Sequence, residues 1–211
     1  LKIKKKLISC HKFNEKKQTI EVIKHINQGK ILSLISDAGT PLLSDPGRLL
    51  VNECIKNKIN IVPIPGASSI TSAMSVSGFS DQFLFYGFLP KTENELNKVL
   101  KNLSKNTFSI VFFIPAKKVN FYIKSFKNYF SDRKIMIGRE ITKIHETFFR
   151  EEIKNLKLFK NLLKGELTVV ISEINNKIKK FDSKKISIQA RKYLKIYSLK
   201  DTVDLIYQSE K

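Results

Sequence analysis

Two short loops rich in small residues have the composition of a ligand-binding site. Residues 36–41 read Ser-Asp-Ala-Gly-Thr-Pro after the apolar run 31–36, and residues 65–69 read Pro-Gly-Ala-Ser-Ser after the run 59–63. Loops at the carboxyl ends of parallel strands carry the ligands of open α/β sheets, and a glycine lets a ligand approach the backbone. The carboxylate of Asp37 would add a charge to the first loop. Each loop taken alone is also consistent with a structural turn or a helix cap.

Strands and helices alternate along the first half of the chain, and these elements would hold the two loops. Apolar runs predict strands, and apolar residues every three or four positions predict helices. Asp45 followed by Pro46 offers a capping acceptor and then a proline at the first helical position, so we expect a helix to begin there. The alternation predicts a parallel sheet with right-handed crossovers. The expected elements are strands at 6–9, 31–36, 59–63 and 83–86 and helices at 15–27, 45–57 and 68–77.

A second unit follows a linker at residues 87–90 and has the same mixture of elements. The expected elements here are helices at 93–103 and around 121–130, and strands at 109–114, 134–137, 147–149 and 167–172. The polar, lysine-rich stretch 175–185 predicts an exposed linker, and short amphipathic helices are expected at 186–197 and 199–208. The sequence thus predicts an α/β fold with a cofactor domain at 1–88, a second α/β domain at 89–175 and a basic C-terminal segment at 176–211.

The formal net charge of +20, from 39 Lys and Arg against 19 Asp and Glu, suits a polyanionic partner such as nucleic acid. Compositional bias toward Lys, Ile and Asn is the competing explanation, because exposed lysines are common on solvated helix faces. No run approaches the roughly 20 apolar residues of a membrane-spanning helix. Cys10 and Cys54 are isolated and lack metal-ligand spacing, so we expect neither a metal site nor a disulfide framework. The cytoplasm is the expected compartment.

The loop motifs occur together in an order that resembles a known family. Residues 36–41 with Ser-Asp-Pro-Gly at 44–47 resemble the signature of the tetrapyrrole methylase superfamily, in its ribosomal RNA branch. The resemblance continues through Ile-Pro-Gly-Ala-Ser-Ser at 64–69, Phe-Leu-Phe-Tyr-Gly-Phe-Leu-Pro at 83–90, Gly-Arg-Glu-Ile-Thr-Lys at 138–143, Glu-Thr at 146–147 and Lys-Gly-Glu at 164–166. Ordered motifs over this length are far more specific than one Asp-Ala-Gly-Thr-Pro.

The resemblance implies two α/β domains with S-adenosylmethionine in the cleft between them. It implies that the first loop contacts the methionine and ribose of the cofactor and that two serines contact its adenosine. It also implies that the second domain covers the cofactor with two apolar residues and completes the cleft near the RNA. The residues so implied are Asp37, Ala38, Gly39, Thr40 and Pro41, then Ser68 and Ser69, then Phe113 and Ile114, and finally Lys164 and Gly165 together with Glu166.

The activity implied by the resemblance is 2′-O-methylation of a cytidine ribose in small-subunit ribosomal RNA. Such a transfer needs the oxygen to be aligned with the methyl group and its proton to be removed. Glu140 and Glu166 are the candidate bases. The alternative is that each is a structural carboxylate, Glu140 paired with Arg139 or Lys143 and Glu166 with Lys164.

Two other functions stay open at this stage, a small-molecule tetrapyrrole methyltransferase and a catalytically impaired, truncated relative that binds RNA. The family's first strand and its cofactor loop match nothing in this chain, so we expect them upstream of Leu1. Residues 112–118 also depart from the family, which usually has a Glu and a His in this segment. The sequence does not decide whether the protein forms a homodimer.

Overall fold

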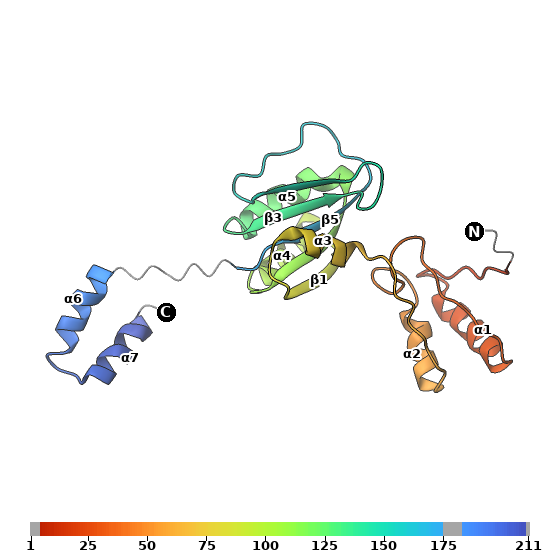
Figure 1. The fold of residues 1–211 in the computed structure, drawn as a ribbon, viewed down its shortest axis with the longest axis horizontal. Helices are drawn as coiled ribbons and strands as arrows, with labels where there is room; N and C mark the ends of the chain where they lie inside the picture. Colours follow the sequence, from red (N-terminus) through yellow and green to blue (C-terminus); the bar gives the residue numbers. More distant parts are fainter. Residues whose placement is uncertain (1–4, 175–182, 210–211) are drawn as a thin grey trace. The chain divides into compact units, whose positions relative to one another are not determined.

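The structure is a computed structural model that describes residues 5–174 and 183–209, and the chain divides into two compact units at residues 1–174 and 175–211 (Figure 1). The first unit contains α1 (Glu15–Asn27), α2 (Arg48–Lys56), α3 (Ser69–Ser77), β1 (Phe83–Phe88), α4 (Glu93–Leu103), β2 (Ser109–Pro115), a 3-10 turn (Ala116–Lys118), α5 (Val119–Tyr129), β3 (Lys134–Arg139), β4 (Thr147–Glu152) and β5 (Glu166–Ile171). The second contains α6 (Ser183–Tyr193) and α7 (Leu199–Ser209).

Five strands form one mixed sheet in the order β1-β2-β5-β3-β4. Strand β1 pairs parallel with β2, whereas β5 pairs antiparallel with both β2 and β3, and β4 pairs antiparallel with β3. Strands β1, β2 and β3 therefore point the same way and end at the same edge of the sheet.

Alternate side chains of the strands point to opposite faces, and each face is covered by helices. On one face, α4 and α5 bury Leu96, Leu100 and Phe126 against Phe112 and neighbouring aliphatic side chains of β3 and β5. On the other face, Ile70 and Ala73 of α3 pack on Val111, Met136 and Val170. This helix–sheet–helix sandwich confirms the expected α/β class, and the sheet is the rigid support for any site at its edge.

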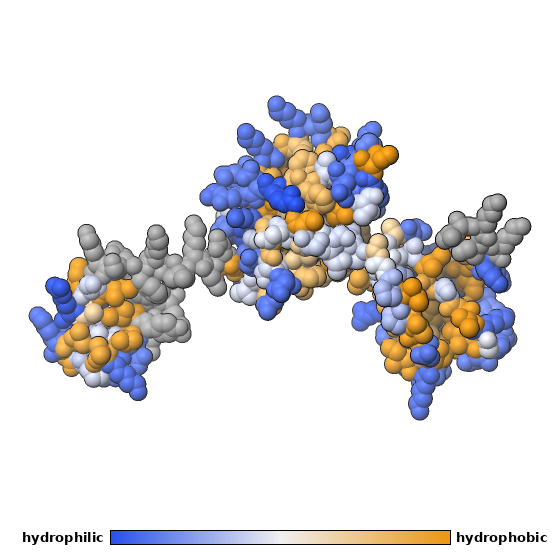
Figure 2. Space-filling model, viewed as in Figure 1, coloured by the Kyte–Doolittle hydropathy of each residue, from blue (hydrophilic) through white to orange (hydrophobic). Residues whose placement is uncertain are grey.

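Three expected strands are wrong. Residues 6–9, 31–36 and 59–63 have no regular secondary structure, and within residues 5–174 they pair with no strand. An extended segment becomes a strand only when a neighbouring backbone accepts and donates its hydrogen bonds, and apolar composition cannot reveal that neighbour. Several of their apolar side chains are exposed, Ile31 almost completely, and Figure 2 shows hydrophobic surface on the part of the chain that contains α1 and α2.

The remaining expectations need smaller corrections. The sheet is not parallel throughout, since only β1 and β2 run parallel among its pairs. Strand β1 continues through Gly87 and Phe88, which we expected to begin a linker. The other helices and strands of the first unit lie within a few residues of their expected positions, and α6 and α7 confirm the two C-terminal helices. Most of the expected linker at 175–185 lies outside the described residues, and the domain boundary expected at residue 88 stays a prediction.

Helix α2 begins at Arg48 and not at Asp45, because a distant residue supplies its cap. The buried carboxylate of Glu15, the first residue of α1, accepts hydrogen bonds from the backbone N–H groups of Gly47 and Leu49, both at 2.8 Å. A carboxylate at a helix N-terminus satisfies free amides and interacts favourably with the helix dipole. Glu15 thus joins α1 to α2.

We expect Glu15→Ala to lower the free energy of unfolding by about 1–3 kcal/mol, because two amides lose their acceptor. Urea denaturation followed by circular dichroism measures the change. Glu21→Ala is the matched control: this α1 glutamate is 3.8 Å from His25 in a partly exposed pair, so its loss should cost no more than about 0.5 kcal/mol. Equal midpoints for Glu15→Ala and the wild type would contradict the capping role.

Candidate active site

The edge where β1, β2 and β3 end is the position at which open α/β sheets bind their ligands. Because β5 is antiparallel to its neighbours, it begins at this same edge. Its first residue, Glu166, lies opposite Pro115 at the end of β2, and Leu167 lies opposite Arg139 at the end of β3. Residues from three separate parts of the sequence therefore meet here.

The two candidate bases are bound to each other. The backbone N–H of Glu166 donates to Oε1 of Glu140 at 2.8 Å, and the backbone N–H of Glu140 donates to the carbonyl oxygen of Glu166 at 3.1 Å. The ammonium of Lys143 lies 3.2 Å from both carboxylates. The Glu140 side chain is 17% exposed and that of Glu166 is 82% exposed, so Glu166 alone presents its carboxylate openly to solvent.

Gly165 is required by this arrangement. Its φ is +96°, in the region that favours glycine, and a Cβ at this position would collide with the side chain of Glu140. The carbonyl oxygen of the preceding residue, Lys164, accepts a hydrogen bond from Nε of Arg139 at 2.9 Å. The structure thus brings together Glu140, Lys164, Gly165 and Glu166, which the sequence had placed in one site.

Phe113 and Ile114 lie near the same end of β2 but face opposite sides of the sheet. The Phe113 ring packs half-buried against Phe85 and Phe88, with ring centroids 5.1 and 5.4 Å apart. The Ile114 side chain is 1% exposed and belongs to the core under α4 and α5. Phe113 can offer its ring to a ligand, whereas Ile114 can offer only its backbone.

The loop 36–41 is mostly exposed and is held by its own hydrogen bonds. The hydroxyl of Ser36 donates to the carbonyl oxygens of Ala38 and Gly39, at 3.3 and 3.2 Å. Gly39 has φ +73°, and no atom lies within 4 Å of the position a Cβ would take. The loop therefore leaves the space beside Gly39 open, so that a ligand could approach its backbone there.

Ser68 and Ser69 stand at the start of α3. Ser68 is extended and occupies the N-cap position, but its hydroxyl makes no capping bond. Its carbonyl oxygen accepts hydrogen bonds from the Thr71 hydroxyl at 3.1 Å and the Ser72 backbone N–H at 3.0 Å. The first amides of α3 and the Ser68 hydroxyl are thus available to a polar ligand.

Within residues 5–174, no hydrogen bond or ion pair joins the loop 36–41 or the start of α3 to the Glu140–Glu166 pair. The same residues, together with 183–209, contain no group of three or more His, Cys, Asp or Glu side chains arranged to hold a metal ion. None of the helices in these ranges is long and apolar enough to span a membrane. The role of each expected contact residue stays a prediction.

A comparison with known proteins supports the family resemblance. The family described as Tetrapyrrole (Corrin/Porphyrin) Methylases matches residues 3–157. The chain belongs to this family. It is 40% identical over 176 residues to the ribosomal RNA small subunit methyltransferase I of Thermotoga maritima, covering 81% of this chain and 78% of that protein. It is 35% identical over 202 residues to the protein of the same name from Pasteurella multocida, covering 93% and 70%.

Solved structures of tetrapyrrole methylases have the same fold. Uroporphyrin-III C-methyl transferase from Thermus thermophilus, complexed with S-adenyl homocysteine, superposes with a TM-score of 0.51 at 10% sequence identity. The match covers 76% of this chain and 74% of that one. At this identity the likeness is one of fold alone.

In this tetrapyrrole methylase, Lys143 lies in the candidate site, although the sequence assigned it no catalytic or binding role. The sequence suggested an ion pair with Glu140 at i, i+3, but not that the same ammonium reaches Glu166, 23 residues further on. The sequence signal that points to Lys143 is the Arg-Glu-Ile-Thr-Lys motif at residues 139–143. Glu140 and Thr142 both have positive φ, of 48° and 69°, and this left-handed turn folds Lys143 back over the carboxylates.

The pKa of the Glu140 carboxyl lies below its ordinary value. The largest cause is the hydrogen bond from the Glu166 backbone N–H, followed by the hydrogen bond from Lys143. The pKa of Lys143 is raised, chiefly by its hydrogen bonds to Glu140 and then to Glu166. A general base works best when its pKa lies near the working pH, so this geometry makes Glu140 a poor base and a good anchor for the β5 loop.

We expect a carbon-detected NMR titration to give Glu140 a midpoint below that of a free glutamate, about 4.3. In Lys143→Gln the midpoint should rise part of the way, because the larger contribution from the Glu166 amide remains. Since the folded-state pKa is depressed, the anchoring is complete above pH about 4.3 and is lost as the pH falls through the lower folded-state value. A midpoint unchanged by Lys143→Gln would remove Lys143 from the cluster.

Proposed function

We propose that this tetrapyrrole methylase transfers the methyl group of S-adenosylmethionine to the 2′-hydroxyl of a cytidine ribose in small-subunit ribosomal RNA. The observation that carries the proposal is the similarity to proteins named ribosomal RNA small subunit methyltransferase I, at 34–40% identity over most of this chain. Methylation of this RNA is the conclusion supported by those relatives. The cytidine and the ribose oxygen are the finer part of the proposal and rest on the motif resemblance.

The charge of the protein supports an RNA substrate over a small tetrapyrrole. A net charge of +20 on 211 residues favours a polyanion, whose release of counterions drives binding. A small-molecule substrate needs only a few cationic groups in its pocket.

The candidate site has the groups that S-adenosylmethionine would need. Open space beside Gly39 admits a ligand to the backbone, and the Ser68 hydroxyl and the first amides of α3 can bind its polar groups. The half-buried ring of Phe113 offers an apolar wall. When bound, S-adenosylmethionine supplies a methyl group on a positively charged sulfur, which a ribose oxygen can attack to leave S-adenosylhomocysteine.

The protein's part in this reaction is alignment and proton removal. Glu166 is the accessible carboxylate at the edge, and we assign it the role of accepting the proton from the ribose hydroxyl at its side-chain oxygen. Glu140 acts through Glu166: it holds the first amide of β5 and thereby fixes where the Glu166 side chain begins. Lys143 lies beside both carboxylates and can orient them or face a phosphate of the substrate.

We expect Glu166→Gln to lower kcat for methyl transfer to small-subunit RNA by roughly 10²–10⁴-fold, the usual contribution of a general base, with little change in the affinity for S-adenosylmethionine. Transfer of radiolabelled methyl groups measures kcat, and calorimetry measures affinity. Glu53→Gln is the matched control, because Glu53 is also an exposed carboxylate beside a lysine, 3.3 Å from Lys56. If Glu166→Gln and Glu53→Gln have the same kcat, Glu166 is not the general base.

The position of the methyl group in the RNA product tests the finer part of the proposal, the cytidine and its ribose oxygen. Primer extension at low nucleotide concentration should pause at a single cytidine whose 2′-oxygen carries the methyl group. A methyl group on a base would refute ribose methylation while leaving ribosomal RNA as the substrate. Methylation of a tetrapyrrole and not of RNA would refute the function as a whole.

We also expect Gly39→Ala to weaken S-adenosylmethionine binding, because its Cβ would enter the space beside the loop 36–41. The matched control is Gly29→Ala. Gly29 has φ +77° and equally open surroundings, so both variants carry a similar backbone strain of about 1–2 kcal/mol, but Gly29 follows α1 and lies in no proposed site. Calorimetry should show the loss for Gly39→Ala alone. Equal affinities for the two variants would exclude the loop from the cofactor site.

A further inference from the structure

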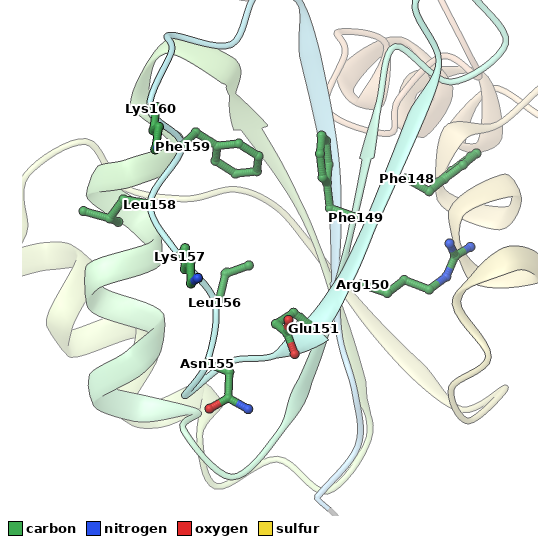
Figure 3. Close-up of a pocket in the computed structure, with 10 residues that line it drawn as sticks. All are labelled: Phe148, Phe149, Arg150, Glu151, Asn155, Leu156, Lys157, Leu158, Phe159 and Lys160. Atoms are coloured by element: carbon green, nitrogen blue, oxygen red, sulfur yellow. The ribbon is translucent and has the colours of Figure 1, made fainter.

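A basin lies beside β4, lined by residues of this strand and of the segment that follows it. Strand β4 ends the sheet, and within residues 5–174 and 183–209 it pairs only with β3, so its outer backbone edge has no partner strand there. The chain then passes alongside this edge, and the basin between the two has a volume of about 640 Å³. Its lining residues are drawn in Figure 3: Phe148, Phe149, Arg150, Glu151, Asn155, Leu156, Lys157, Leu158, Phe159 and Lys160.

Two aromatic rings point toward each other across the basin (Figure 3). Phe149 of β4 and Phe159 of the loop meet edge to face with ring centroids 5.0 Å apart. Asn120 of α5 holds Phe159 in place: its Oδ1 accepts from the Phe159 backbone N–H, and its Nδ2 donates to the Phe159 carbonyl oxygen, both at 2.9 Å. These two hydrogen bonds, together with the packing of both rings against the core, hold the aromatic pair in place.

The loop along the basin is strongly basic. Residues 154–164 contain four lysines and no acidic residue. Lys154 lies 3.0 Å from a carboxylate oxygen of Glu152, but Lys157 and Lys160 are exposed and, within residues 5–174, belong to none of the ion pairs. Two free ammonium groups therefore stand beside a fixed aromatic pair.

The nearby arginine is not part of this charge. Figure 3 shows Arg150 and Phe148 directed away from the aromatic pair. The Arg150 guanidinium donates to the carbonyl oxygen of Val76 at 2.6 Å and lies over the Phe148 ring, 5.5 Å from its centroid. Lys157 and Lys160 are thus the cations free to bind an incoming anion.

The basic loop leads directly to the candidate active site. It ends at Lys164, whose carbonyl oxygen is bound by Arg139, and the next two residues are Gly165 and Glu166. A polyanion lying along 154–164 would therefore be continuous with the proposed proton acceptor.

We propose that the basin and the loop 154–164 bind the single-stranded segment of the RNA substrate that flanks the methylated nucleotide. Lys157 and Lys160 bind its phosphates, and a base packs on the Phe149–Phe159 pair. Single-stranded nucleic acids are commonly held in this way, by a basic track that follows the backbone and by aromatic rings that contact the bases. The inference rests on the proposed function, since it takes RNA as the substrate. A second copy of the chain fits the free β4 edge less well, because two basic loops would then face each other.

The test compares two double variants. Lys157→Gln/Lys160→Gln removes the proposed phosphate contacts, and Lys98→Gln/Lys101→Gln removes two exposed lysines at the same spacing from α4. Fluorescence anisotropy with a single-stranded fragment of small-subunit ribosomal RNA is measured across roughly 50–200 mM salt. The slope of log affinity against log salt should fall by about 0.7 per lysine in the first variant, which is roughly a five-fold loss of affinity per lysine near 0.1 M salt. The α4 variant should keep the wild-type slope.

Equal slopes for the two variants would overturn the proposal. So would a change of oligomeric state in sedimentation with RNA affinity unchanged, because the basin would then bind protein. The wild-type methyl-transfer assay separates this inference from the proposed function. If the wild type methylates ribosomal RNA but the two variants have equal salt slopes, the RNA-binding role of the basin is wrong and the proposed function stands. If the wild type methylates no RNA, the function fails whatever the slopes are.

Discussion

Strand β5 runs antiparallel between β2 and β3, and the candidate active site depends on this single arrangement. Its residues Val169, Val170 and Ile171 are fully buried and contribute to the cores on both faces of the sheet. Because the strand is fixed along its length, its first residue is fixed too, at the edge where the neighbouring strands end. A parallel β5 would carry Glu166 to the opposite edge, one strand length away.

The turn after β3 is strained, and β5 stabilises it. Left-handed conformations at residues other than glycine cost about 1–3 kcal/mol each, and this turn has two, at Glu140 and Thr142. The opposing interactions are the two hydrogen bonds between Glu140 and Glu166, and a third in which the Thr142 N–H donates to Glu146 at 2.7 Å. Strain of this kind persists where surrounding contacts determine the conformation, which is common at sites that bind or transform a ligand.

Arginine and lysine have different tasks in this protein. Arg133 is buried and donates to the carbonyl oxygens of Ser104, Asn106 and Ser172, while Arg139 and Arg150 each hold one further carbonyl oxygen. The planar, forked guanidinium suits such bracing, whereas the flexible lysine side chain keeps its ammonium in water. The many lysines thus produce a positive electrostatic potential that attracts a polyanion, while three of the five arginines stabilise the fold through hydrogen bonds to carbonyl oxygens.

The sequence by itself determined the α/β class and most of the local elements. Helical spacing predicted α1 and α4 with their observed bounds. These features follow from nearest neighbours and from residue type, which a linear chain displays directly. Only the tertiary structure decided which segments pair. The apolar runs at 31–36 and 59–63 have the composition of strands but no partner within residues 5–174, and α2 starts at Arg48 because Glu15, 33 positions earlier, caps it. Hydrogen-bond partners so distant in sequence leave no periodic pattern, so they exist only once the chain has folded.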